Sequence, residues 1–229
     1  MKLLSLDTST KLLSAAITEN GMCIGSYFQN AGRTHSVTAL PLIDALLTNT
    51  STRLDELDAF AVTIGPGSFT GLRIGIATVQ GLAAAEKKPC YAVSSLESMA
   101  QQARGFMGTI CCSIDARNGL VYNALFIGKD GHAPLRLTDD RVIALDELKE
   151  NLKSSKSPIC FIGEHPDLWY NEGNRIALPD ALTALNAARA TEGKDAIAAK
   201  ELAPLYLQIP QAQREKESAE EKRGNIPCK

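Results

Sequence analysis

The chain has 229 residues, of which 45% are hydrophobic and 22% are charged, and its formal net charge at pH 7 is −2. This length suits one large domain or two smaller lobes, each with its own core. The near balance of charge excludes an overall basic surface of the kind that binds nucleic acid electrostatically. The three histidines lack metal-ligand spacing, so we expect no protein-bound catalytic metal.

The N-terminal segment and the cysteines favour a cytoplasmic protein. Asp7 interrupts the first apolar run too early for a signal peptide. The most apolar segment, 64–85, contains Arg73, Gln80 and several glycines, which argues against a membrane span. None of the cysteines forms a CxxC pair, so without a secretory signal we expect reduced, buried thiols. We therefore expect a cytoplasmic location and no membrane contact.

The first hundred residues predict a sheet with helices packed on its faces. Short apolar runs at 2–7, 12–18 and 22–28 are typical of strands, and the Asn20–Gly21 turn predicts a hairpin between the last two. The pattern then alternates between helix and strand, which indicates an α/β fold. The expected elements are a helix at 34–47, a strand at 60–65, a helix at 69–85, a strand at 90–94 and a helix at 95–104.

The second half begins as the first does. Two strands are expected at 109–116 and 120–127, and Asp115 stands to the second half as Asp7 stands to the first. A repeat of this length predicts a duplicated fold with two related lobes. The further elements are expected to be a helix at 145–152, a strand at 158–163 and a helix at 180–190. The predicted divisions are a first lobe at 1–104, a smaller second lobe at 105–210 and a charged, flexible tail at 211–229.

A polar turn at Asp7–Thr10 is the first candidate site. A carboxylate with neighbouring hydroxyls at such a turn can hold a nucleotide phosphate or its Mg²⁺. In the alternative, Asp7 and Ser9 only bond the backbone of the turn. We expect no cofactor to be required. The candidates for weak ATP or ADP binding with Mg²⁺ are Asp7, Thr8, Ser9 and, in the second lobe, Asp115.

The glycine-rich turn at Gly65–Gly71 is the second candidate. It lacks the Lys-Ser/Thr pair of a P-loop and the spacing of GxGxxG. An anion could bind at the helix N-terminus that Ser68 would cap. In the alternative, Gly71 and Gly75 allow a tight connection between strand and helix. His35 could act as a general base, but no acidic neighbour is placed to orient it, and a packing role is the alternative.

The helix after this turn is apolar almost all the way round. A helix with one buried face would carry more charge on its other side. It therefore lies deep in the core, or it packs on its own domain with one face and on another chain with the other. One side carries Leu72, Ile76, Val79 and Ala83, and the other carries Gly71, Ile74, Gly75, Thr78 and Leu82.

Six segments, taken in order, resemble the bacterial TsaB (YeaZ) family. They are MKLLSLDTST, THSVTALPLI, IGPGSFTGLRIGIATVQGLA, VSSLESMA, IDARNGLVYNALF and LAPLYLQ, and together they span about residues 1–209. The segment 65–83 is very specific to this family. The family often ends in YLR where this chain has Leu207–Gln208, and the tail beyond Pro210 has no family counterpart.

The resemblance implies an actin-like ASKHA (ribonuclease H-like) fold, with two related lobes of mixed sheet and flanking helices. It also implies a part in making threonylcarbamoyladenosine at position 37 of tRNAs that read ANN codons. In that pathway TsaD transfers the threonylcarbamoyl group, the ATPase TsaE supports turnover, and TsaB is the non-catalytic partner that binds TsaD. The chain would then meet tRNA only through the complex.

The residues at one motif agree with a non-catalytic role. In TsaD, a segment with a pattern like VNHLEGH supplies two histidines that hold the catalytic metal. The same stretch here is Val93–Met99, and the ligand positions fall on Ser95 and Met99, which hold divalent ions poorly. We therefore expect neither a metal nor a catalytic residue.

The resemblance also implies a partner surface. TsaB proteins pair through helices of the first lobe, with TsaD or, in its absence, with a second copy as a homodimer. The helices at 34–47 and 69–85 would supply that surface, and Gly71, Gly75 and Gly81 would let a partner helix approach closely. The candidate partner-binding residues are Val37, Leu40, Leu72, Ile76, Val79, Gln80 and Ala83.

Two other functions stay open. One is an ATP-dependent ASKHA transferase or kinase, which would need the Asp7 and Asp115 loops to hold Mg²⁺–ATP. The other is a peptidase that acts on TsaD. The missing ligand histidines argue against metalloproteolysis but not against a metal-independent cleavage.

Overall fold

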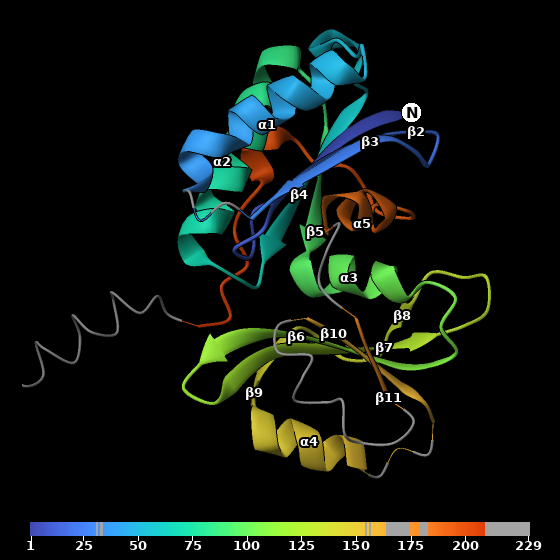
Figure 1. The fold of residues 1–229 in the computed structure, drawn as a ribbon. Coiled ribbons are helices and arrows are strands. Elements are labelled where there is room, and N and C mark those ends of the chain that lie inside the picture. Colours follow the sequence, from blue (N-terminus) through green and yellow to red (C-terminus); the bar gives the residue numbers. More distant parts are fainter. Residues whose placement is uncertain are drawn as a thin grey trace, which may run out of the picture.

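The computed structural model describes residues 1–30, 32, 34–153, 155, 157–163, 175–178 and 183–208. Within these residues the strands form a five-stranded and a six-stranded sheet, one above the other in Figure 1. No helix in the described part of the chain is long and apolar enough to cross a membrane.

The first sheet has the order β3–β2–β1–β4–β5. β1 pairs antiparallel with β2 and parallel with β4, and β4 pairs parallel with β5. Side chains alternate across β1: Leu4 and Leu6 enter the main core of this lobe, whereas Leu3 and Ser5 face the opposite side. The strands are β1 (Lys2–Asp7), β2 (Leu13–Glu19), β3 (Met22–Gln29), β4 (Ala59–Gly65) and β5 (Cys90–Ser94).

The second sheet repeats this topology. Its order is β11–β10–β6–β7–β8, and β9 also pairs with β7. β6 pairs antiparallel with β7 and parallel with β10, as β1 does with β2 and β4. The duplication expected from the sequence is therefore confirmed, and two sheets of this kind make an actin-like ASKHA fold. The strands are β6 (Gly108–Arg117), β7 (Leu120–Gly128), β8 (Leu135–Arg136), β9 (Arg141–Ala144), β10 (Ile159–Gly163) and β11 (Arg175–Leu178).

The helices separate and cover the sheets. α1 and α2 pack on one face of the first sheet, α5 and α3 lie between the two sheets, and α4 covers the far side of the second sheet (Figure 1). The α-helices are α1 (His35–Asn49), α2 (Phe69–Glu86), α3 (Ser95–Ala100), α4 (Leu145–Lys153) and α5 (Thr183–Arg189). Short 3₁₀ turns are η1 (Leu54–Glu56), η2 (Gln101–Ala103) and η4 (Ala199–Glu201).

One predicted boundary is wrong. Residues 183–208 were assigned to the second lobe with the rest of 105–210, but they pack on the first. Ser5 Oγ donates to the Ala184 carbonyl at 2.6 Å, and the Ala184 amide donates to Ser14 Oγ at 3.0 Å. These two bonds and apolar packing hold α5 on the first sheet, since Ala188 packs with Leu3 and Leu185 packs with Ala16. The predicted tail at 211–229 lies outside the described residues.

Polar contacts join the two lobes around α3. Glu97 on α3 pairs with Lys194 at 2.9 Å, on the segment after α5, and with Arg136 of β8 at 3.7 Å. Ser94 Oγ donates to Asp140 at 2.6 Å, and Asp140 in turn pairs with Arg136 at 2.6 Å. The α3 helix is therefore fixed to both halves of the chain.

Candidate functional site

Helix α2 buries one side only. Ser68 caps its N-terminus, where Ser68 Oγ accepts from the Gly71 amide at 3.2 Å. The exposed residues recur at intervals of four and three positions, so they form one stripe along the helix. The buried side consists of Gly71, Leu72, Gly75, Ile76, Val79 and Ala83. The exposed stripe consists of Thr70, Arg73, Ala77, Gly81 and Ala84, and Ala85 beside it is also exposed.

Four of the predicted partner-binding residues are therefore assigned wrongly. Ile76, Val79 and Ala83 belong to the main core cluster of the first lobe, and Leu72 is fully buried. A helix that covers a sheet buries its largest apolar side chains, which leaves the small ones outside. Gln80 is half-buried, and its Nε2 donates to the carbonyls of Ala199 and Leu202 at 3.1 Å each. Gln80 thus holds the η4 segment against α2.

Helix α1 places the other two predicted residues outside. Val37 is 64% exposed and Leu40 is 55% exposed. Ala39, Ile43 and Leu46 form the buried side of this helix, which packs against α2 and β2. Pro41 lies inside the helix on its exposed side. The exposure of Val37 and Leu40 agrees with the predicted surface, and their binding to a partner stays a prediction.

The Asp7 turn is buried and uses most of its polar groups internally. Asp7 Oδ1 accepts from the amide and hydroxyl of Ser9 at 2.8 and 2.7 Å, and Thr8 Oγ1 donates to the Gly71 carbonyl at 2.8 Å. The Ser68 amide donates to the Ser9 carbonyl at 2.7 Å. Asp7 Oδ2 is buried and has no hydrogen-bond partner among the described residues. The bonds favour the structural alternative for this turn, and nucleotide binding stays a prediction.

The glycine turn packs directly on the Asp7 turn. A Cβ at Gly67 would lie 2.3 Å from the Ser9 carbonyl oxygen, and one at Gly71 would lie 2.1 Å from that of Thr8. These glycines are therefore needed for a close approach between two backbones. His35 Nε2 lies 2.9 Å from the Thr10 carbonyl, so it fixes the start of α1 to the same turn. Both observations support the packing alternatives for Gly65–Gly71 and His35.

The remaining candidates do not assemble into a catalytic centre. Asp115 lies within β6 and is exposed, and its Oδ1 accepts from the Arg117 amide at 2.7 Å. Ser95 is buried, its hydroxyl has no hydrogen-bond partner in the described part of the chain, and Met99 lies in the core of the second lobe. Among the residues that the structure describes, no group of three or more His, Cys, Asp or Glu could hold a metal ion.

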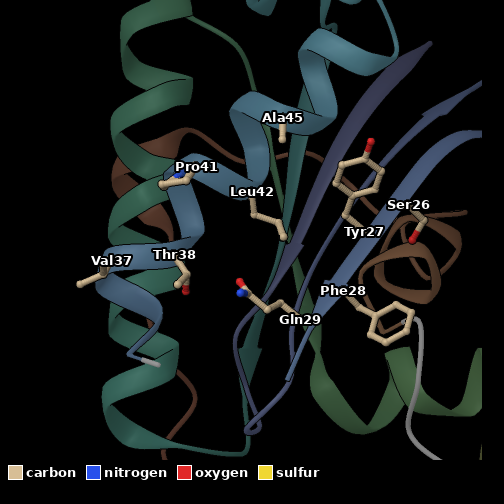
Figure 2. A pocket seen from close by; sticks show the side chains of 9 residues that line it. All are labelled: Ser26, Tyr27, Phe28, Gln29, Val37, Thr38, Pro41, Leu42 and Ala45. Carbon is tan, nitrogen blue, oxygen red and sulfur yellow. The ribbon is translucent and has the colours of Figure 1, made fainter. Parts of the chain in front are cut away.

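A groove of about 760 Å³ lies between β3 and α1. Figure 2 shows Leu42 of α1 and Gln29 of β3 directed into the gap. The lining includes Tyr27 and Thr38, and none of the lining residues is charged. The groove therefore has no His, Lys, Cys or carboxylate for acid–base or metal chemistry, and Tyr27 is the one acid–base side chain in its lining.

One functional candidate was missed from the sequence. Arg73 lies over the Phe69 ring at 4.1 Å, and its Nε donates to the Tyr206 hydroxyl at 2.9 Å. The rings of Phe69 and Tyr206 stack at 4.8 Å. The spacing of four residues between Phe69 and Arg73 could have indicated their contact. Nothing local in the sequence indicates Tyr206, which comes from the other end of the chain.

The comparisons with known proteins point to two related groups, TsaD and TsaB. A family model described as TsaD, tRNA N6-adenosine threonylcarbamoyltransferase, matches residues 25–156. The TsaB protein of Bacillus subtilis is 36% identical over 168 residues, which is 73% of each chain. That of Escherichia coli is 32% identical over 221 residues, covering 90% of this chain and 94% of the relative.

A solved structure shows the same relationship. YeaZ from Pseudomonas aeruginosa is 28% identical and superposes with a TM-score of 0.72, covering 90% of this chain and 99% of that one. The two sheets of like topology and these relatives agree with the resemblance in the sequence. The chain belongs to the TsaB (YeaZ) family, whose named members are tRNA threonylcarbamoyladenosine biosynthesis proteins.

Proposed function

We propose that this chain is a non-catalytic subunit that binds and supports TsaD, with TsaE, in threonylcarbamoyl transfer to adenosine 37 of tRNAs that read ANN codons. The observation that carries this proposal is the outward side of the first-lobe helices, which we call the helix-pair face. It consists of Val37 and Leu40 on α1 and Ala77, Gly81 and Ala84 on α2.

The helix-pair face has the composition of a docking surface. Val37 and Leu40 are large apolar side chains that are more than half exposed, and burying the exposed part of each would contribute about 1–2 kcal/mol. The small residues of α2 add little area but allow another helix to approach the backbone. A stable complex buries about 1,200–2,000 Å² in total, and the outward sides of two adjacent helices suit an interface of that size.

The arrangement of the motif residues supports a non-catalytic role. By the resemblance to TsaD, Ser95 and Met99 would stand at the positions of its metal-binding histidines, and both side chains are buried in the protein. The proposal therefore needs no cofactor and assigns the chemistry to the partner. It brings the chain to tRNA only through the complex, and it allows a second copy to occupy the helix-pair face when TsaD is absent.

A pair of matched variants tests the proposal. Leu40 on the helix-pair face and Leu137 on the second lobe are 55% and 54% exposed. Leu40→Glu places a charge in the proposed interface, and Leu137→Glu makes the same change elsewhere. We expect light scattering of each variant mixed with TsaD of the same organism to show a complex with Leu137→Glu and none with Leu40→Glu. A complex of full yield with Leu40→Glu would contradict the proposal.

A further inference from the structure

Arg73 is held in a fixed orientation on the outward side of α2. Its guanidinium lies over the Phe69 ring at 4.1 Å, a cation–π contact, and its Nε donates to the Tyr206 hydroxyl at 2.9 Å. The Phe69 ring is itself stacked on that of Tyr206 at 4.8 Å. A long side chain that is already ordered loses less rotamer entropy when it binds.

The outer part of the guanidinium is available to a ligand. Among the described residues, the hydrogen bond and the cation–π contacts of Arg73 are those with Phe69 and Tyr206, and the hydrogen bond uses Nε alone. Arg73 is exposed, so both Nη groups can donate to another molecule. Two such groups in a planar fork match the two oxygens of a carboxylate.

Arg73 continues the helix-pair face toward the N-terminus of α2. It stands four residues before Ala77 and eight before Gly81, so all three lie on one stripe. Arginine and tyrosine are also the residue types that most often dominate the energy of a protein interface. A partner that covers the small residues of α2 would therefore also cover Arg73.

We propose that Arg73 is a carboxylate-binding anchor of the helix-pair face, and that the partner docked there presents an Asp or Glu side chain to its Nη groups. This inference rests on the proposed function, because it takes TsaD as the partner. The argument for a carboxylate is charge complementarity. A partner that covers the guanidinium removes its water, and this cost is compensated only if the partner supplies an anion.

Tyr206 acts as a positioning residue for this anchor. The segment that carries it is tied to the first lobe by the Leu205 amide, which donates to the Ile64 carbonyl at 2.7 Å. Gln80 of α2 holds the carbonyls of Ala199 and Leu202 of the same segment. These bonds place residues 199–206 beside the helix-pair face. The Tyr206 hydroxyl, which accepts from Arg73 Nε, then orients the guanidinium.

The test is the affinity for TsaD of the same organism, measured by calorimetry. Arg73→Gln removes the charged hydrogen-bonded pair between the guanidinium and the partner's carboxylate. Its affinity for TsaD should therefore be about tenfold to a hundredfold lower than that of wild type. Arg73→Lys keeps the charge but not the fork, and Tyr206→Phe removes only the orienting hydroxyl, so each should weaken binding about threefold to tenfold. Lys129→Gln removes an exposed cation of the second lobe, away from the helix-pair face, and should change affinity less than about twofold.

The salt dependence gives a readout that a merely structural role would not move. The gap in affinity between wild type and Arg73→Gln should narrow as NaCl is raised from about 0.05 to about 0.5 M, because salt screens the pair. Equal affinities of wild type and Arg73→Gln, with Leu40→Glu still unable to bind, would overturn the anchor and leave the proposed function standing. Failure of the wild-type chain itself to bind TsaD would overturn the proposed function.

A second copy of this chain is the rival source of a carboxylate. Asp44 is exposed on α1, seven residues after Val37, and so lies on the same side of that helix. If Arg73→Gln and Asp44→Asn each weaken self-association while affinity for TsaD is unchanged, the carboxylate is the second copy's. That result would overturn the inference as stated for TsaD.

Discussion

The close packing of the Asp7 turn on α2 can be measured with three glycines of one helix. Replacing each with alanine adds the same methyl group at three depths. At Gly81 the new Cβ meets nothing within 4 Å; at Gly75 it would lie 2.2 Å from the Thr8 hydroxyl; and at Gly71 it would lie 2.1 Å from the Thr8 backbone carbonyl oxygen.

The expected changes in unfolding free energy follow from two opposing effects. Alanine stabilises a helix interior by up to about 1 kcal/mol relative to glycine. Overpacking a close contact costs about 1–3 kcal/mol, with the upper end expected where backbone must move. Gly81→Ala should therefore gain up to about 1 kcal/mol, and Gly71→Ala should lose about 2 kcal/mol. Gly75→Ala should fall between them, because Thr8 can rotate but then loses its bond to Gly71.

Urea unfolding of the three variants, monitored by far-UV circular dichroism, gives the order of their stabilities directly. Equal slopes against urea would show that the variants expose the same surface, so that the midpoints report stability. The helix itself supplies the control, since Gly81 differs from the other two only in its surroundings. If Gly71→Ala is as stable as Gly81→Ala, the two backbones do not meet as described.

Two further predictions concern the core. Val79→Arg puts an unpaired charge into the main core and should prevent folding, at a cost in unfolding free energy above about 4 kcal/mol. Ala77→Arg, two residues away, should fold and lose only partner binding. Limited proteolysis of both variants checks this, and a folded Val79→Arg would refute it. Burial raises the pKa of Cys90 and of Cys160 from 9.0 to about 11. The unfolded chain then releases these protons first, so the thermal midpoint should fall as pH rises from 9.0 to about 11. The Cys90→Ala, Cys160→Ala double variant should show a shallower fall, and an unchanged slope would exclude these thiols as its cause.

Local patterns predicted most of the fold. The Asn20–Gly21 turn and the apolar runs around it correctly indicate the β2–β3 hairpin, and the glycine turn correctly marks the start of α2. The short strands β8, β9 and β11 were missed, because two to four residues carry too little periodicity. The placement of α5 was also wrong, since a chain that crosses back to the first lobe leaves no local signal.

The partner surface was harder to predict, because helical spacing groups residues into faces but does not indicate which face packs on the sheet and which is left for a partner. Leu72, Ile76 and Val79 were correctly grouped on one side of α2, but that side was assigned to a partner. The size of these side chains favours burial in the core, since the opposite stripe with Ala77 and Gly81 offers little apolar area to bury. The role of Tyr206 required the structure, because its contacts with Phe69 and Arg73 join the two ends of the chain.

The most direct test of a docking subunit is the rate of threonylcarbamoyl transfer by TsaD of the same organism as this chain is added. We expect no transfer by the chain alone and a saturable increase with TsaD and TsaE present. Leu40→Glu should raise the concentration for half-maximal effect more than about tenfold, and Leu137→Glu should match wild type. Transfer by the chain without TsaD, or identical curves for the two variants, would contradict the account.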